Sequence, residues 1–270
     1  MEKIANYHTH TYLCKHATGT PLDYVRQAEK DGCRELGFSD HCPYPATFED
    51  VWPGVRMEES QVPLYKKLIA EARQAAPFPV YWGFECEYDE RYKHYYGDTL
   101  LGSFGAQYLA LGPHWVTDGS SHIGAPDITD NALLNRYIDQ IIAGLSTGFF
   151  AFLAHPDLFM MGHREWDSQA QSCLMALLDA AVDLDIPIEI NGLGMSRTPI
   201  ETSRGIRYPY PYQEFWECAA QTNVRVICNS DAHKSQDVIF NAWKARDFAG
   251  RFGLAPIATL ETLHLQNHQP

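Results

Sequence analysis

Short apolar runs alternate with amphipathic stretches along most of this 270-residue chain. The apolar runs predict seven buried strands, at residues 4–7, 34–39, 78–84, 108–112, 149–153, 187–190 and 224–228. Helical periodicity follows most of them, at residues 21–31, 59–75, 130–145, 168–184, 212–221 and 237–252. Strands that are each followed by a helix form a parallel sheet with right-handed crossovers. At this length a closed (β/α) barrel is favoured over an open doubly wound sheet.

Other features of the sequence agree with an α/β barrel. Neither Gly-x-Gly-x-x-Gly nor a Walker-type loop occurs, which argues against a nucleotide-binding open sheet. We expect a single domain over residues 1–270. In the helix at residues 59–75, Leu64, Leu68 and Ala72 should face the sheet. Residues 194–211 predict a loop, and residues 257–260 predict a terminal strand.

The overall charge restricts the classes of partner. The formal net charge is -13, whereas a protein that binds nucleic acid presents a basic surface to the phosphates. No apolar run approaches the roughly 20 residues of a membrane span, and no signal peptide is apparent before the first strand. The seven cysteines are scattered and form no Cys-x-x-Cys, as is typical of reduced thiols. We therefore expect a cytoplasmic protein without nucleic-acid or membrane partners. The sequence leaves its oligomeric state open.

A histidine or an acidic residue follows nearly every predicted strand. The first strand runs into Tyr7-His8-Thr9-His10, and a His-x-His pair on extended backbone points both imidazoles to one side. Barrel enzymes gather their chemistry at the C-terminal ends of the strands. Nine side chains are therefore expected to converge there: His8, His10, His16, His41, Glu85, His114, His155, Asp231 and His233.

Nine nitrogen and oxygen donors exceed the four that a tetrahedral zinc site takes. They suit two or three divalent ions with Glu85 bridging a pair, and imidazole-rich sites accept Zn, Mn or Fe. Two ions about 3.5–4 Å apart activate a bridging water and stabilise an in-line displacement at phosphorus. A single histidine is more often structural or on the surface. That interpretation is kept for the other five: His94, His122, His163, His264 and His268.

Several motifs follow one another in a fixed order. They are His8-Thr9-His10, the downstream His16, Ser39-Asp40-His41, Gly83-Phe84-Glu85, His155-Pro156-Asp157 and Asp231-Ala232-His233. This series, over residues 4–233, resembles the PHP (polymerase and histidinol phosphatase) family and is closest to its histidinol-phosphatase branch. The Ser-Asp-His ending and the position of Glu85 are its most specific parts. The resemblance implies a distorted (β/α)7 TIM-like barrel that holds three divalent metal ions.

The resemblance also implies how the ligands divide among the ions. The first ion would be bound by His8, His10, Glu85 and Asp231, the second by Glu85, His114 and His155, and the third by His16, His41 and His233. The chain departs from the branch just before His114. It reads Leu-Gly-Pro there, where the branch usually has Gly-Ser-Val, so we expect the neighbouring wall of the pocket to differ.

By the same resemblance, the chain is a phosphomonoesterase that uses a metal-bridging hydroxide. Its implied substrate is L-histidinol phosphate, an intermediate of histidine biosynthesis. Three divalent ions and two carboxylates leave a local charge of about +4, which suits a phosphate dianion. Arg197 and Arg164 lie in loops after strands, where either could bind phosphate or remain a solvated cation. Five aromatic residues could line an imidazole pocket or belong to the core: Trp52, Trp82, Tyr88, Tyr92 and Trp115.

Three alternatives stay open at this point. An amidohydrolase also begins with His-x-His on a barrel strand, but its pattern does not call for His16, His41 or a terminal Asp-x-His. A non-catalytic metal-binding barrel would be expected to have lost ligands, whereas all nine are present. A PHP phosphoesterase for another small phosphate ester would keep this metal site and change the organic pocket. The sequence does not identify the group that protonates the leaving alkoxide.

Overall fold

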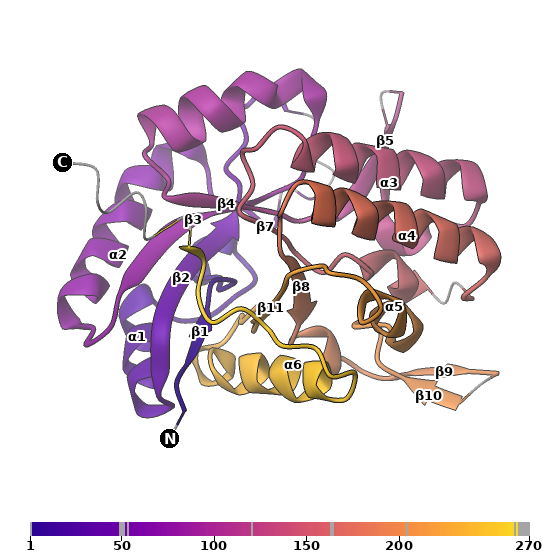
Figure 1. The fold of residues 1–270 in the computed structure, drawn as a ribbon. Helices are drawn as coiled ribbons and strands as arrows, with labels where there is room; N and C mark the ends of the chain where they lie inside the picture. Colours follow the sequence, from indigo (N-terminus) through magenta and orange to yellow (C-terminus); the bar gives the residue numbers. More distant parts are fainter. Residues whose placement is uncertain are drawn as a thin grey trace.

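The computed structural model describes residues 2–48, 52, 54–119, 121–162, 165–203, 205–261 and 263. A seven-stranded sheet occupies its centre, in the order β1-β2-β3-β4-β7-β8-β11 (Figure 1). The strands are β1 (Ile4–Asn6), β2 (Cys33–His41), β3 (Val80–Cys86), β4 (Tyr108–Leu111), β7 (Phe152–Leu153), β8 (Ile188–Asn191) and β11 (Val226–Asn229). Neighbouring strands pair in parallel. The predicted seven strands and the α/β class are confirmed.

The two outer strands of the sheet meet just beyond their C-terminal ends. A parallel bridge joins Thr9 to Ala232. The His10 amide donates to the Ala232 carbonyl at 2.9 Å, and the Ala232 amide donates to the His8 carbonyl at 3.3 Å. The barrel therefore closes at the end where the predicted ligands follow the strands. This local closure is the distortion of the (β/α)7 TIM-like barrel.

Helices lie around the sheet (Figure 1), and six of those in the described residues are α-helices. They are α1 (Pro21–Lys30), α2 (Val62–Ala75), α3 (Asn131–Leu145), α4 (Ser168–Asp183), α5 (Gln213–Ala219) and α6 (Phe240–Gly250). Side-chain caps fix where three of them begin. Thr20 and Asp23 form a capping box at α1, and the carboxylates of Asp130 and Asp167 accept from backbone amides at the first turns of α3 and α4. Such caps satisfy amides that have no partner within the helix.

The buried face of α2 differs from the predicted one. A 3-10 turn, Glu59–Gln61, precedes the helix, and the buried residues are Val62, Tyr65, Ile69 and Ala72. Leu64 is 41% exposed, so its predicted contact with the sheet was wrong. Tyr65 is buried there instead, and its hydroxyl reaches the sheet, where it accepts from the Asp40 amide at 3.3 Å and donates to the Gly83 carbonyl at 3.4 Å.

The sequence pattern did not predict two β-hairpins. One joins β5 (Trp115–Asp118) to β6 (Ser121–Gly124), and the other joins β9 (Ile200–Thr202) to β10 (Gly205–Arg207). The second lies within residues 194–211, which were predicted as a loop, and it projects from the body of the molecule (Figure 1). Short antiparallel pairs with few buried residues have little periodicity to detect.

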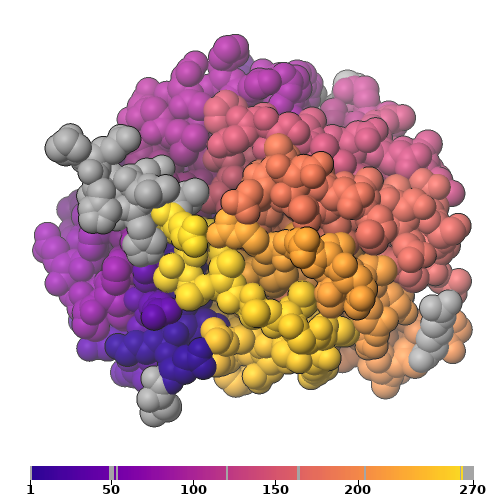
Figure 2. All heavy atoms as spheres, in the orientation of Figure 1, coloured from indigo at the N-terminus to yellow at the C-terminus, as the bar shows by residue number. Residues whose placement is uncertain are grey.

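Residues 257–260 do not form the predicted terminal strand. Instead they lie across the barrel end opposite the predicted ligands. The Ile257 amide donates to the Val226 carbonyl at 2.8 Å, and the Leu260 amide donates to the Tyr7 hydroxyl at 3.2 Å. Figure 2 shows this C-terminal segment (yellow) against the N-terminal residues (indigo). The segment thus covers the bottom of the barrel without joining the sheet.

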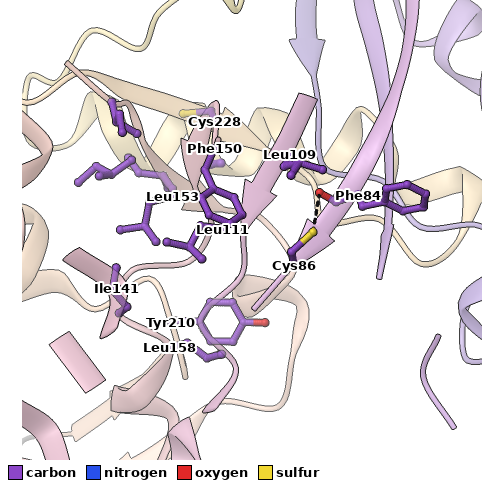
Figure 3. Close-up of a cluster of buried hydrophobic side chains, with 14 of the residues drawn as sticks. Phe84, Cys86, Leu109, Leu111, Ile141, Phe150, Leu153, Leu158, Tyr210 and Cys228 are labelled. Atoms are coloured by element: carbon purple, nitrogen blue, oxygen red, sulfur yellow. Dashed lines mark hydrogen bonds between the residues drawn. The ribbon is translucent and has the colours of Figure 1, made fainter. Parts of the chain in front are cut away.

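Apolar side chains fill both the barrel and the layer between sheet and helices. Inside the barrel, the Tyr108 hydroxyl donates to the Tyr7 carbonyl at 2.7 Å. A Cβ on Gly37 would lie 2.4 Å from that hydroxyl, so only glycine leaves room for the ring. Figure 3 shows side chains of the outer layer, among them Leu111 of β4, Leu153 of β7 and Ile141 of α3.

Two expectations from composition agree with the structure. All seven cysteines are free thiols. Among the described residues, no helix combines the length and apolar character that crossing a membrane requires.

Candidate metal centre

All nine predicted ligand residues come together at the closed end of the barrel. Five groups of three residues have ligand atoms within 4.8 Å of one another, and every predicted residue belongs to at least one group. The groups are His8-His10-Glu85, His8-His155-Asp231, His41-Glu85-His114, His16-His41-His233 and His10-Cys14-His233. The predicted convergence is therefore observed, whereas the role of each residue as a ligand stays a prediction. Cys14 is an addition that the sequence pattern did not indicate.

Glu85, at the end of β3, stands at the centre of the cluster and is 1% exposed. Each of its oxygens lies near several imidazole nitrogens: Oε1 is 2.8 Å from His155 Nε2 and 3.3 Å from both His8 Nε2 and His114 Nε2, and Oε2 is 3.1 Å from His41 Nδ1 and 3.5 Å from His10 Nε2. Burial raises the pKa of Glu85, but the surrounding imidazoles, His114 foremost, outweigh it and hold the pKa well below its usual range. A carboxylate in this position can bridge two cations.

Gly112 makes room for the Glu85 side chain. A Cβ at this position would lie 2.4 Å from Glu85 Oε1, so a larger residue would require the carboxylate to shift. Gly112 is part of the Leu-Gly-Pro sequence in which the chain departs from the family branch. The glycine lets the segment after β4 approach the central carboxylate.

Several buried polar atoms of the cluster have no hydrogen-bond partner. They are His8 Nε2, both ring nitrogens of His10, His41 Nδ1, His155 Nδ1 and Asp231 Oδ1. Burying a polar atom without a partner costs about 1–3 kcal/mol, and native proteins contain few such atoms. A bound cation would supply the missing partner for these lone pairs. The donor set of imidazoles and carboxylates fits divalent Zn, Mn or Fe.

His16 and His233 provide a second sign of a cation-binding site. His16 Nδ1 lies 2.9 Å from the Cys14 carbonyl and His233 Nδ1 lies 3.0 Å from the Asp231 carbonyl. A carbonyl only accepts, so each Nδ1 carries the hydrogen. The two Nε2 atoms are 2.8 Å apart, and burial with the neighbouring His10 lowers the pKa of His233 to about 4. Near neutral pH two lone pairs therefore face each other, an arrangement that a shared cation would stabilise.

The backbone is strained at two of the predicted ligands. Among the described residues, four other than glycine have positive φ, and His155 (27°) and Asp231 (49°) are two of them. Such conformations cost of the order of 1–3 kcal/mol each and persist where the surroundings enforce them. A third, Lys15, ends the turn that precedes His16. The strain therefore concentrates where the chain delivers side chains into the cluster.

Two acidic residues that the sequence analysis did not assign to the site hold histidines in place. Glu189 of β8 lies 2.9 Å from His8 Nδ1, and Glu87 lies 2.8 Å from His114 Nδ1. Arg56 pairs with Glu87 at 3.4 Å, and together with His114 it overcomes burial and lowers the pKa of Glu87 to about 2. The sequence contained a signal for each of these two acids. Glu189 is a charged residue inside the apolar run at residues 186–190, and Glu87 follows Glu85 at the two-residue spacing that puts both side chains on one side of a strand.

The predicted phosphate-binding arginines have different outcomes. Arg164 lies outside the described residues. Arg197 Nε donates to the Tyr210 hydroxyl at 3.2 Å, and the Tyr210 ring packs against His155 with centroids 6.0 Å apart. Arg197 therefore lies at the rim of the cluster, one side chain away from a predicted ligand.

Only some of the five candidate aromatic residues lie near the predicted ligands. The ring of Trp52, which is 37% exposed, lies 5.8 Å from that of His114, and buried Trp115 packs behind it at 5.4 Å. Trp82, Tyr88 and Tyr92 pack away from the ligands, against Tyr65, Tyr96 and Phe48 respectively. Of the five other histidines, His94 is exposed and His122 packs against Phe48 and Trp115. His163, His264 and His268 lie outside the described residues.

Comparisons with known proteins agree with this geometry. A family model of the PHP domain matches residues 6–192. A Deinococcus radiodurans protein described as a probable histidinol-phosphatase is 28% identical over 263 residues, which cover 93% of this chain and 96% of that protein.

Two solved structures share the fold. A Listeria monocytogenes protein described as a putative histidinol phosphatase, HisK, superposes with a TM-score of 0.70 at 18% identity, covering 86% of this chain and 96% of that one. The histidinol phosphate phosphatase of Lactococcus lactis subsp. lactis, complexed with zinc, L-histidinol and phosphate, has a TM-score of 0.70 at 17% identity, covering 97% and 98%. At these identities the two structures establish the barrel fold.

Proposed function

The chain belongs to the PHP domain family, and on that basis we propose that it is a metal-dependent phosphomonoesterase, a histidinol-phosphatase. The reaction converts L-histidinol phosphate and water to L-histidinol and phosphate, a step of histidine biosynthesis. The relative from Deinococcus radiodurans supports this choice because it aligns over nearly the whole of both chains. The Lactococcus lactis neighbour contains zinc, L-histidinol and phosphate, which is the set of components that the proposal requires.

The observation that carries the proposal is the convergence of nine donor residues whose buried polar atoms lack partners. We assign them to three ions as the family resemblance implies. His8, His10, Glu85 and Asp231 would hold the first, Glu85, His114 and His155 the second, and His16, His41 and His233 the third. The groups His8-His10-Glu85 and His16-His41-His233 support this division, since the ligand atoms of each lie within 4.8 Å of one another.

Divalent ions held there would lower the pKa of a bound water and place positive charge beside a phosphate dianion. The chain's own residues divide the remaining work. Glu85 and Asp231 neutralise part of the metal charge. The imidazoles would bind the ions as neutral donors. Arg197 would bind a phosphate oxygen from the rim, since charged hydrogen bonds to phosphate are short and strong.

The rim suggests how the substrate would lie. The rings of His114 and His155 are 5.0 Å apart. Arg197 approaches from the His155 side through Tyr210, and Trp52 lies on the His114 side. We propose that the phosphate lies over this pair and that the indole of Trp52 packs against the imidazole of L-histidinol. Aromatic contacts of this kind contribute about 0.5–1.5 kcal/mol.

The remaining expectations form part of the proposal. The partner is a small phosphorylated metabolite, and residues 1–270 form one domain of a cytoplasmic enzyme. We propose Zn, Mn or Fe as the metal, because imidazole-rich sites accept all three. The zinc in the Lactococcus lactis structure favours Zn for the first trial.

A substrate panel tests the proposal directly. Phosphate release is measured from L-histidinol phosphate and from other monoesters with protein of known metal content, with and without a chelator. We expect the highest kcat/KM for L-histidinol phosphate and loss of activity with the chelator. A higher kcat/KM for another ester would assign the enzyme to that substrate. No release from any ester by fully loaded protein would refute the enzyme and favour a non-catalytic metal-binding barrel.

A further inference from the structure

We propose that Glu189 is a positioning residue that organises the His8-His155-Asp231 side of the metal centre. It would fix His8 in the tautomer that turns Nε2 toward the cluster, and it would hold the ends of the strands that deliver the other two side chains. The inference rests on the proposed function, because it assumes that these residues bind metal. It adds a residue to that function that neither the motif pattern nor the family resemblance contains.

Four hydrogen-bond donors surround the Glu189 carboxylate, which is 0% exposed. Oε1 lies 2.9 Å from His8 Nδ1 and accepts from Asn229 Nδ2 at 3.0 Å. Oε2 accepts from the His155 amide at 3.0 Å and from Asn191 Nδ2 at 2.8 Å. A carboxylate offers about four lone-pair directions, so the donors occupy all of them.

These contacts determine the tautomer of His8. The carboxylate only accepts, so His8 Nδ1 must donate its hydrogen to Glu189. Its Nε2 is then the ring nitrogen left to bind metal, and it points at the cluster, 3.3 Å from Glu85 Oε1 and 3.6 Å from Asp231 Oδ1. This Nε2 has no hydrogen-bond partner in the protein. His8 is therefore preset as a metal ligand.

Glu189 also joins four strands at the mouth of the barrel. His8 and His155 follow β1 and β7, Asn191 ends β8 and Asn229 ends β11. Asn191 Nδ2 also donates to Asp231 Oδ2, at 3.1 Å. Glu189 thus contacts two predicted ligands directly and a third through one amide. These three, His8, His155 and Asp231, are also one of the groups whose donor atoms lie within 4.8 Å.

The Glu189 carboxylate accepts hydrogen bonds from groups other than lysine and arginine. Its partners among the described residues are two side-chain amides, a backbone amide and an imidazole, and none of these is a lysine or arginine. Carboxylates that accept from a ligand histidine fix its orientation and raise its basicity, and their loss typically lowers metal affinity or activity roughly 10–100-fold.

Glu189→Gln tests the inference sharply because glutamine cannot satisfy all four donors. If its oxygen faces His8, its NH2 meets the His155 amide and Asn191. If its NH2 faces His8, the imidazole must accept at Nδ1 and carry its hydrogen on Nε2, which then cannot bind metal. We expect zinc affinity, measured by competition with a chromophoric chelator, to fall roughly 10–100-fold. The control is Glu35→Gln, since Glu35 is a buried carboxylate of β2 that accepts from the Tyr7 hydroxyl, and it should leave zinc affinity unchanged.

A double-mutant cycle separates positioning from a merely structural role. If Glu189 acts through His8, adding Glu189→Gln to His8→Gln should lower zinc affinity far less than it does in the wild type. Additive losses, or an unchanged zinc affinity in Glu189→Gln, would overturn the inference. A wild type that binds no zinc would refute the proposed function itself, and the wild-type titration reports that outcome separately.

A measurement on the wild type remains decisive should Glu189→Gln not fold. Long-range 1H–15N spectra of the metal-free protein distinguish the two imidazole tautomers, and His8→Gln identifies the His8 signals. We expect His8 to carry its hydrogen on Nδ1. An Nδ1 without a hydrogen would overturn the inference.

Discussion

Two walls of the metal centre, called here the deep wall and the rim wall, each contain a glutamate that holds a histidine. The surroundings of the two glutamate–histidine pairs differ. In the deep wall, Glu189 holds fully buried His8 at 2.9 Å and has amides as its other partners. In the rim wall, Glu87 holds His114 at 2.8 Å and is paired with Arg56. The His114 side chain is 13% exposed and Trp52 lies beside it.

The difference assigns separate tasks to the walls. In the rim wall, Arg56 cancels the charge of Glu87, so that wall orients a histidine with little effect on the field at the centre. In the deep wall the charge of Glu189 has no such counter-ion among the described residues, and it strengthens the field that holds cations. We infer that the deep wall sets metal affinity and that the rim wall, where the chain departs from its family branch, shapes the substrate pocket.

Glu85→Gln should have the largest effect, because Glu85 Oε1 is where the two walls meet, 3.3 Å from both His8 and His114. Loss of the shared carboxylate should lower kcat for phosphate release by more than the roughly 100-fold upper range for a residue behind a ligand. The rate and the metal content are measured on the same sample. Wild-type turnover with full metal content would contradict the shared role. Glu71→Gln, with the same charge change on the exposed side of α2, is the control.

Arg56→Met tests the counter-ion of the rim wall. Removing one partner of a buried pair leaves the other charge uncompensated and costs about 3–5 kcal/mol in the free energy of unfolding; Arg56 and Glu87 are 4% and 2% exposed. Arg56→Met combined with Glu87→Gln should recover much of that loss. Urea unfolding measures both variants. The control Arg136→Met breaks an exposed pair with Asp118 and should cost at most about 1 kcal/mol, so equal losses would argue against a buried counter-ion.

The sequence predicted the nine candidate ligands but not the two glutamates that hold His8 and His114. Strand ends carry ligands because the barrel topology requires convergence there, so all nine candidates could be placed without coordinates. Glu189 was missed because a strand pattern gives no partner for a buried acid, and its four donors come from four different strands.

The rim depends on contacts that no local pattern contains. Arg56 reaches Glu87 from a stretch without secondary structure, and the two hairpins are too short for periodicity. Leu64 and Tyr65 are adjacent on α2, and Tyr65 lies on the buried face with Val62 and Ile69. Apolar character alone favoured Leu64, whereas the Tyr65 hydroxyl finds partners on two strands.

The pH dependence of stability distinguishes Asp157, next to the deep wall, from Glu87 in the rim wall. This carboxyl follows His155 of the deep wall and accepts from the Tyr212 amide and Trp216 Nε1, and burial raises its pKa to about 6. The folded pKa lies above the unfolded value of about 3.9. Its contribution to stability is therefore present below about pH 4 and is lost as the pH rises through 6.

Asp157→Asn removes that contribution. Its free energy of unfolding relative to wild type should rise by up to about 3 kcal/mol between about pH 4 and pH 7, measured by urea unfolding of metal-free protein. Glu87 has the opposite sign, because its pKa of about 2 gives stability that is lost only as the pH falls below about 4. Glu87→Gln should therefore show no such rise over this range. A flat difference for Asp157→Asn would contradict the assigned pKa.

Arg197→Ala tests the phosphate end of the proposed substrate. A hydrogen bond to a charged group contributes about 1.5–3 kcal/mol, so kcat/KM should fall about 10- to 150-fold. The loss should be similar for every phosphate monoester because they share the phosphate. Arg225→Ala removes the same charge beside Asp185 and Glu261 and should leave kcat/KM unchanged. An unchanged kcat/KM in Arg197→Ala would make Arg197 a solvated loop cation.

Trp52→Ala tests the organic end and should have the smallest effect. An aromatic contact of about 0.5–1.5 kcal/mol corresponds to a loss of about 2- to 13-fold in kcat/KM for L-histidinol phosphate. Glycerol phosphate has no ring, so its kcat/KM should change little, and Trp52→Phe should keep most of the discrimination between the two esters. Equal losses for both esters would mean that Trp52 supports His114 rather than the substrate. The rim wall would then contribute to the metal centre as the deep wall does, and the division of tasks between them would fail.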